Sequence, residues 1–137
     1  MDPLARAFES LPGGAAGRLR AALAADEHVT HVVPAIGCVL ALTDRRLLVL
    51  REGSAFRPKT GVRDWTLADR PAVRAGLVRQ GTGSLVIQSH RDVTSVFVRG
   101  ANWEDALALV GALRGRVRTL TEAEASRPSA QDHKTDG

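Results

Sequence analysis

Between residues 28 and 98 the chain consists of short apolar runs separated by residues that favour turns. Runs of this length that are rich in Val, Ile, Leu and Thr are typical of β-strands. About seven of them occur, at 28–33, 36–43, 46–51, 63–67, 72–79, 84–89 and 93–98. We expect the first run to end at Pro34, which has no amide hydrogen to give to a β-ladder. Strands at such short spacing predict an antiparallel barrel or sandwich.

Three connections between these strands indicate how they pair. Asp44-Arg45 is so short that the strands on either side of it must form an antiparallel hairpin. Gly81-Thr82-Gly83 predicts another turn, and because it does not open a helix it lacks the row of amides that cradles a phosphate. Residues 52–62 contain Gly and Pro without periodicity and predict the longest loop.

Helical periodicity is found at both ends of the chain. Asp2 and Pro3 suit the start of a first helix, and a second helix is expected at about 15–25. Near the other end Asn102 is a suitable N-cap, and Asp105 can complete a capping box. An apolar face along this final helix predicts that it packs on the sheet. That face consists of Trp103, Ala106, Val110, Leu113 and Val117.

Three arginines, Arg114, Arg116 and Arg118, fall in what we expect to be the last turn of this helix. Cations at that position are stabilised by the negative end of the helix dipole, so they need no ligand to explain them. Beyond Leu120 the composition offers almost nothing to bury, which predicts a disordered tail. We therefore expect a helical segment at 1–26, one domain at 27–119 and a tail at 120–137.

The composition is that of one globular domain, and it limits the classes of partner that we expect. The 137 residues are 44% hydrophobic and 25% charged, which excludes a fully disordered or collagen-like chain. No apolar run reaches the roughly 18 residues of a membrane-spanning helix, and the start does not resemble a signal peptide. We therefore expect a soluble, cytoplasmic protein. The net charge of +4 is not gathered in a basic stripe, so we expect no nucleic-acid partner.

The hairpin carries a recognisable motif. Residues 41–50 read Ala-Leu-Thr-Asp-Arg-Arg-Leu-Leu-Val-Leu, which resembles the Thr-Asp-Arg-Arg-Leu hairpin of bacterial pleckstrin-homology-like (PH-like) domains of the YokE-like and short PH kinds. The order of predicted elements over about residues 15–118 agrees with this resemblance. It implies a mainly β (α+β) fold, a partly open barrel of about seven antiparallel strands capped by the C-terminal amphipathic helix, with N-terminal helices. It also implies a binding or scaffolding module without catalytic residues or cofactors.

One departure from the family bears on the ligand. In eukaryotic PH domains, phosphoinositide headgroups are typically held by Lys and Arg around the loop that joins the first two strands. Here that loop is Pro34-Ala35-Ile36-Gly37 and contains no basic residue. The resemblance therefore favours a protein partner over a lipid headgroup.

Candidate metal-binding and catalytic residues have simpler interpretations. His28 and His31 are three residues apart and point to opposite faces of a strand, so we expect surface histidines rather than a metal site. Cys38 alternates with apolar residues and is expected in the core. A nucleophilic pair of Cys38 with His31 or His90 is the alternative, but no third group orients it. We interpret both tryptophans as packing residues, and expect no enzyme activity and no metal.

Basic and aromatic residues combine at one place, the long loop, where three cations lie near Phe56. We treat these cations and two more on the hairpin as a candidate site for an anion or a partner, with solvated side chains as the simpler interpretation. The candidates are Arg57, Lys59, Arg63, Arg45 and Arg46.

Our leading hypothesis is a non-catalytic module that binds another protein through an edge strand or through the groove beside the final helix. Peripheral association with a membrane and a homodimer formed through exposed edge strands are compatible with it. The alternative is an anion-binding module that uses the five basic residues to hold a lipid headgroup or nucleic acid. A salt titration separates the two, because binding to polyanions weakens steeply as salt rises.

Overall fold

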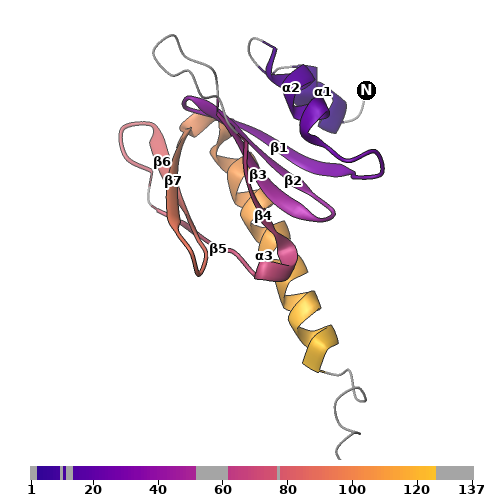
Figure 1. Ribbon diagram of the computed structural model, residues 1–137. Coiled ribbons are helices and arrows are strands. Elements are labelled where there is room, and N and C mark those ends of the chain that lie inside the picture. Colours follow the sequence, from indigo (N-terminus) through magenta and orange to yellow (C-terminus); the bar gives the residue numbers. More distant parts are fainter. Residues whose placement is uncertain (1–2, 10, 12–13, 52–61, 77, 126–137) are drawn as a thin grey trace, which may run out of the picture.

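The computed structural model describes residues 3–9, 11, 14–51, 62–76 and 78–125. Its strands form two antiparallel sheets, a four-stranded one in the order β1-β2-β3-β4 and a three-stranded one in the order β5-β6-β7 (Figure 1). The strands are β1 (Val29–Ala35), β2 (Cys38–Thr43), β3 (Arg46–Arg51), β4 (Val62–Thr66), β5 (Ala72–Ala75), β6 (Thr82–Gln88) and β7 (Val93–Arg99). The short connection at Asp44-Arg45 joins β2 to β3 as an antiparallel hairpin, as the sequence predicts.

The two sheets do not close into a complete barrel. They meet at the turn between β1 and β2, where the backbone N–H of Ile36 donates to the carbonyl of Phe97 (2.9 Å). Helix α3 (Trp103–Ala125) packs against strands of both sheets (Figure 1). This arrangement is the partly open barrel with a C-terminal helix that the sequence predicts, and the expected fold class is confirmed. No helix among the described residues is long and apolar enough to cross a membrane.

The main core lies between the inner faces of the two sheets and one face of α3. Its members alternate along the strands and recur every three or four residues along the helix, as burial of one face requires. Each fully buried Leu, Ile or Val contributes about 1.5–3 kcal/mol of hydrophobic stabilisation. The core contains Leu40, Leu42, Leu47, Val49, Leu85, Ile87, Val96, Val98, Ala106, Leu109, Val110 and Leu113.

A second apolar cluster lies on the outer face of the four-stranded sheet. Helices α1 (Pro3–Glu9) and α2 (Ala15–Ala22) cover that face (Figure 1), and Leu19 of α2 is completely buried against it. Every residue of β2 is therefore buried, because the strand has core on both sides. This explains why the sequence of β2 is apolar throughout, apart from Thr43 at its end.

The first strand extends further than the sequence predicts. β1 continues through Pro34, which pairs with Val39 of β2, and ends at Ala35. Because β1 is the outer strand of its sheet, one of its sides lacks a ladder, and a proline is tolerated there.

The connection between β5 and β6 also differs from the prediction. β5 ends at Ala75, and the turn is made by Gln80 and Gly81, whose φ angles are 53° and 79°. Positive φ at both positions is typical of the tight turns that connect antiparallel strands. The prediction of a Gly81-Thr82-Gly83 turn is therefore wrong in its boundaries, since β6 begins at Thr82 and includes Gly83.

Residue 83 must be a glycine because the side chain of Trp103, at the start of α3, packs directly on it. The ring of Trp103 lies so close that a Cβ at residue 83 would come under 3.0 Å from three ring carbons. We expect Gly83→Ala to lower the free energy of unfolding by about 1–3 kcal/mol, because a rigid ring and a strand must separate. Urea denaturation measures this change.

A glycine without such a neighbour provides the control. Gly111 is an exposed residue of α3, and a Cβ there would meet nothing within 4 Å. Alanine at a helix interior is favoured over glycine by about 0.5–1 kcal/mol, so Gly111→Ala should raise the stability. Equal effects of the two substitutions would show that the contact between Gly83 and Trp103 is unimportant.

Candidate functional site

Arg46, the second arginine of the hairpin motif, is an internal anchor. Its Nε and Nη2 donate to the two carboxylate oxygens of Glu27 (2.8 and 2.9 Å), and Nη1 donates to Asp64 (2.8 Å). Nη2 also donates to the carbonyl of Ala22, the last residue of α2 (2.7 Å). The guanidinium therefore joins β3 to β4, to α2 and to the segment before β1, which leaves it little capacity for an external anion.

Glu27 is held on all sides by this arrangement. Its side chain is only 1% exposed, and besides Arg46 it accepts hydrogen bonds from the hydroxyl of Thr43 (2.7 Å) and the backbone N–H of Ala24 (3.0 Å). The hydrogen bonds from Arg46 hold the pKa of the Glu27 carboxyl at about 2, well below its ordinary 4.5. The carboxylate is thus charged at every pH at which the protein is expected to work.

The rest of the motif holds the hairpin turn. The hydroxyl oxygen of Thr43 accepts the backbone N–H groups of Arg45 and Arg46, both at 3.0 Å. Asp44 accepts the backbone N–H of His28 (3.0 Å) and thereby fastens the turn to the residue before β1. The polar groups of Thr-Asp-Arg-Arg are therefore accounted for by folding, with no ligand required.

The other described candidates for the anion site also have carboxylate partners within the chain. Arg45 pairs with Asp26 (2.6 Å), and Arg63 pairs with Asp92 while its guanidinium lies over the ring of Trp65, 5.6 Å from the ring centre. These carboxylates neutralise the cations locally, so their attraction for an added anion is reduced.

The candidate cations also do not converge. In the β3–β4 ladder Arg46 is opposite Thr66, whereas Arg63 is opposite Val49. Residues 46 and 49 point to opposite faces of the strand, so Arg46 and Arg63 lie on opposite faces of the sheet. Arg57 and Lys59 lie outside the described residues. Among the residues described, therefore, the structure does not bring the sequence-predicted site together.

His31 and Cys38, the candidates for metal binding and catalysis, have contacts that belong to the fold. His31 receives a hydrogen bond at Nδ1 from, or donates one to, the hydroxyl of Thr30 (2.9 Å), and burial together with the charge of Arg116 lowers its pKa. Cys38 is buried, as predicted. In the described part of the chain no group of three or more His, Cys, Asp or Glu could hold a metal ion.

Both tryptophans pack rather than present a platform. Trp65 is buried in the main core, and its indole N–H points to Asp92 (3.4 Å), while Trp103 is partly buried against Gly83.

The three arginines of α3, Arg114, Arg116 and Arg118, do not lie in the last turn of the helix as the sequence predicts. The helix runs past Leu120, where the tail was expected to begin, and ends at Ala125. Arg118 therefore lies about two turns before the end of the helix, and the last turn contains no basic residue. The explanation by the helix dipole is wrong, because that effect is confined to the last turn.

These arginines are bound only by neutral groups, or by none. Arg114 donates to the carbonyl of Val73 (2.8 Å), and Arg116 donates to the carbonyl of Thr43 and to the hydroxyl of Thr30 (2.9 Å). The side chain of Arg118 has no hydrogen bond or ion pair with the described residues. Unlike the candidates of the hairpin, they keep their positive charge available to a ligand.

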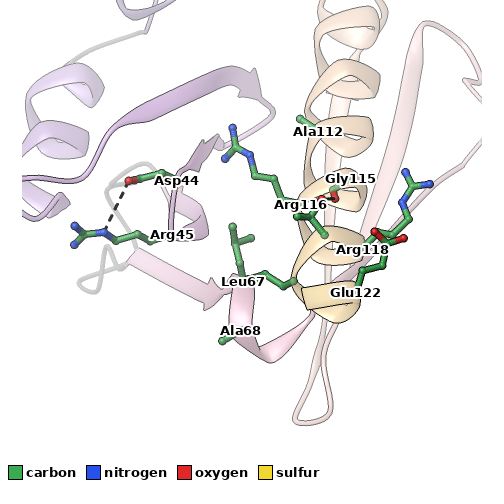
Figure 2. Close-up of a pocket in the computed structure, with 11 residues that line it drawn as sticks. Asp44, Arg45, Leu67, Ala68, Ala112, Gly115, Arg116, Arg118 and Glu122 are labelled. Carbon is green, nitrogen blue, oxygen red and sulfur yellow. Dashed lines mark hydrogen bonds and ion pairs between the residues drawn. The ribbon is translucent and has the colours of Figure 1, made fainter. Parts of the chain in front are cut away.

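A groove runs along each side of this part of α3. The larger one has a volume of about 980 Å³ and lies between α3, the β2–β3 turn and the 3-10 turn Leu67–Asp69, with Arg116 directed towards the β2–β3 turn (Figure 2). Its charged lining is mixed, since Asp44 and Glu122 accompany Arg45, Arg116 and Arg118.

The smaller groove, about 320 Å³, lies between α3 and β5, and we call it the β5 groove. Among the residues that the structure describes, its lining contains four arginines, no acidic residue and an apolar portion. Arg70 is paired with Glu124, whereas Arg74 and Arg118 have no partner among the described residues. The β5 groove is lined by Arg70, Pro71, Ala72, Val73, Arg74, Arg114, Val117 and Arg118.

Comparisons with known proteins identify the fold. No protein family and no individual curated protein matches the sequence. Among solved structures, the pleckstrin homology domain from Shewanella amazonensis SB2B superimposes with a TM-score of 0.56 over 77% of this chain and 96% of that one, at 11% sequence identity. At this identity the likeness shows a PH-like fold alone, and the YokE-like or short PH subtype stays a prediction.

Proposed function

We propose that this PH-like chain is a non-catalytic binding module whose partner is a protein, bound beside the part of α3 that carries Arg114, Arg116 and Arg118. The observation that carries the proposal is the position of the arginines whose charge no carboxylate of the described chain neutralises. Within the described ranges the side chains of Arg74 and Arg118 in the β5 groove have no partner, whereas Arg45, Arg46 and Arg63 are each neutralised by a carboxylate of the same chain.

The lining of the β5 groove suits a polypeptide better than a lone phosphate group. Ala72 and Val117 give it an accessible apolar portion, and the arginines are distributed along α3, β5 and the residue before Pro71. Arg114 and Arg118 are one helical turn apart and therefore lie on the same side of α3. A segment of chain with carboxylate side chains complements both features, because it supplies several charges and apolar surface together.

The proposal is tested by comparing three probes at equal salt. They are a fluorescently labelled peptide of alternating Glu and Val, vesicles that contain phosphatidylglycerol, and a DNA duplex. We expect the peptide to bind, and the double variant Arg74→Glu/Arg118→Glu to weaken that binding by about tenfold or more through charge repulsion. Fluorescence polarisation measures the peptide and DNA, and cosedimentation measures the vesicles.

Arg63→Gln is the matched control, because it removes a cation that lies away from α3 and is paired with Asp92. We expect it to leave peptide binding unchanged. If vesicles or DNA bind instead of the peptide, and Arg63→Gln abolishes that binding, the anion-binding alternative through Arg57, Lys59, Arg63, Arg45 and Arg46 takes the place of this proposal.

A further inference from the structure

The β5 groove is bordered by a strand with a free side. β5 is the outermost strand in the order β5-β6-β7, so β6 pairs with only one of its sides. The N–H of Gly76 donates to the carbonyl of Ser84 on β6 (2.7 Å). Bonding in an antiparallel pair alternates from one residue to the next, so Val73 and Ala75 direct their N–H and C=O groups away from β6.

Arg114 occupies one of these outward groups. Its Nη2 donates to the carbonyl of Val73 (2.8 Å), which reaches across from α3 to the strand edge. Covering an edge strand with a neighbouring helix or loop is a common way to keep it from pairing with other chains, and Arg114 does this from α3. The contact is replaceable, because the N–H of an added strand can satisfy the same carbonyl and a carboxylate can satisfy the guanidinium.

The described part of the chain places no strand beside the outward groups of Val73 and Ala75. An extended ligand that pairs there brings alternate side chains towards α3, where Arg114 and Arg118 stand. The charge of the lining then selects carboxylates at those alternate positions. Arg70 is paired with Glu124, but Arg74, Arg114 and Arg118 have no carboxylate partner among the described residues.

The geometry points to strand addition: an extended acidic segment of a partner protein pairs with the free edge of β5 and takes over the contacts of Arg114. This inference rests on the proposed protein-binding function and names the strand and the class of ligand. Backbone hydrogen bonds then supply affinity, and the arginines supply selectivity for acidic residues.

Ala75 allows a direct test. Because its N–H points away from β6, Ala75→Pro removes a donor from the free edge without removing one from the β5–β6 ladder. Its side chain is exposed, and the preceding Arg74 is already in the extended conformation that a following proline requires. We expect Ala75→Pro to weaken binding of the alternating Glu-Val peptide at least tenfold, whereas Ala75→Ser, which keeps the N–H, binds like the wild type.

A peptide of the same composition with Glu-Glu-Val-Val order is the ligand control. Adjacent glutamates point to opposite sides of a strand, so it should bind more weakly than the alternating peptide. Hydrogen exchange of the Val73 and Ala75 amides in the wild-type protein gives a readout that does not depend on folding of the proline variant. We expect the alternating peptide to slow exchange at both amides.

The outcomes separate the two proposals. If the alternating peptide binds Ala75→Pro as well as the wild type, and leaves exchange at Val73 and Ala75 unchanged, strand addition is wrong. Loss of binding in Arg74→Glu/Arg118→Glu in the same experiment would leave the protein-binding function standing. If neither peptide binds the wild-type protein, the proposed function itself fails.

Discussion

Replacing Arg46 by alanine is expected to lower the free energy of unfolding by about 3–5 kcal/mol. The substitution leaves the carboxylate of Glu27 buried without its cation, since that side chain is 1% exposed. It also removes the donor to the carbonyl of Ala22 and the ion pair with Asp64. Urea denaturation at neutral pH, followed by circular dichroism, measures the loss.

Arg45 provides a matched control for this prediction. It is the adjacent residue, and Arg45→Ala causes the same change in net charge, but its ion pair with Asp26 is exposed to solvent. Exposed pairs contribute little because water and salt screen them, so we expect nearly unchanged stability. Arg46→Lys should recover only part of the stability, because an ammonium cannot reproduce the bidentate contact with Glu27. A similar loss in Arg45→Ala and Arg46→Ala would contradict the role of Arg46 as the anchor.

Acid is expected to destabilise the protein through Glu27. The pKa of its carboxyl is about 2 in the folded protein and 4.5 ordinarily. As pH falls, the unfolded chain therefore takes up the proton first. The stabilising contribution is complete above about pH 4.5 and disappears as pH falls through about 2, with a total of about 3 kcal/mol. Unfolding free energies measured in urea across this pH range check the prediction.

Glu27→Gln isolates this contribution from that of other carboxylates. The variant has no titrating group at residue 27, and it leaves Arg46 with a neutral partner, so it should be less stable than the wild type at neutral pH. The difference in unfolding free energy between the two proteins should shrink as the pH falls from about 4.5 to 2. A difference that stays constant over that range would show that Glu27 is not the group responsible.

The hairpin itself can be predicted from the motif, but the role of Arg46 within the motif cannot. Asp44-Arg45 specifies a hairpin because a connection that short has few alternatives, and the structure has that hairpin. The partner of Arg46 is 19 residues away in the sequence, before β1. No local pattern links the two positions, so the sequence indicates Arg46 as a candidate anion ligand. In the structure its guanidinium forms an internal ion pair with Glu27.

The binding surface was harder to predict for a related reason. The composition after Leu120 predicts that the helix has ended, which places the arginines of α3 near the negative end of the helix dipole. The helix continues to Ala125, and the turns around Arg118 and beyond are largely exposed, so no apolar face marks their presence in the sequence. The sequence likewise does not show that one side of β5 is unpaired, because which strands lie at a sheet edge depends on which strands meet in space.

Local patterns were enough to predict the strands, the β2–β3 hairpin and the final helix, though not where β1, β5 and α3 end. Alternation every second residue and recurrence every three or four are local consequences of backbone geometry. Which arginines are neutralised, and which strand keeps a free edge, follows from the packing of the whole fold, because charge pairing and strand pairing depend on distances between residues far apart in the chain. Arg46 meets Glu27, Arg114 meets Val73, and Arg118 meets no partner among the described residues only once the sheets and α3 are packed.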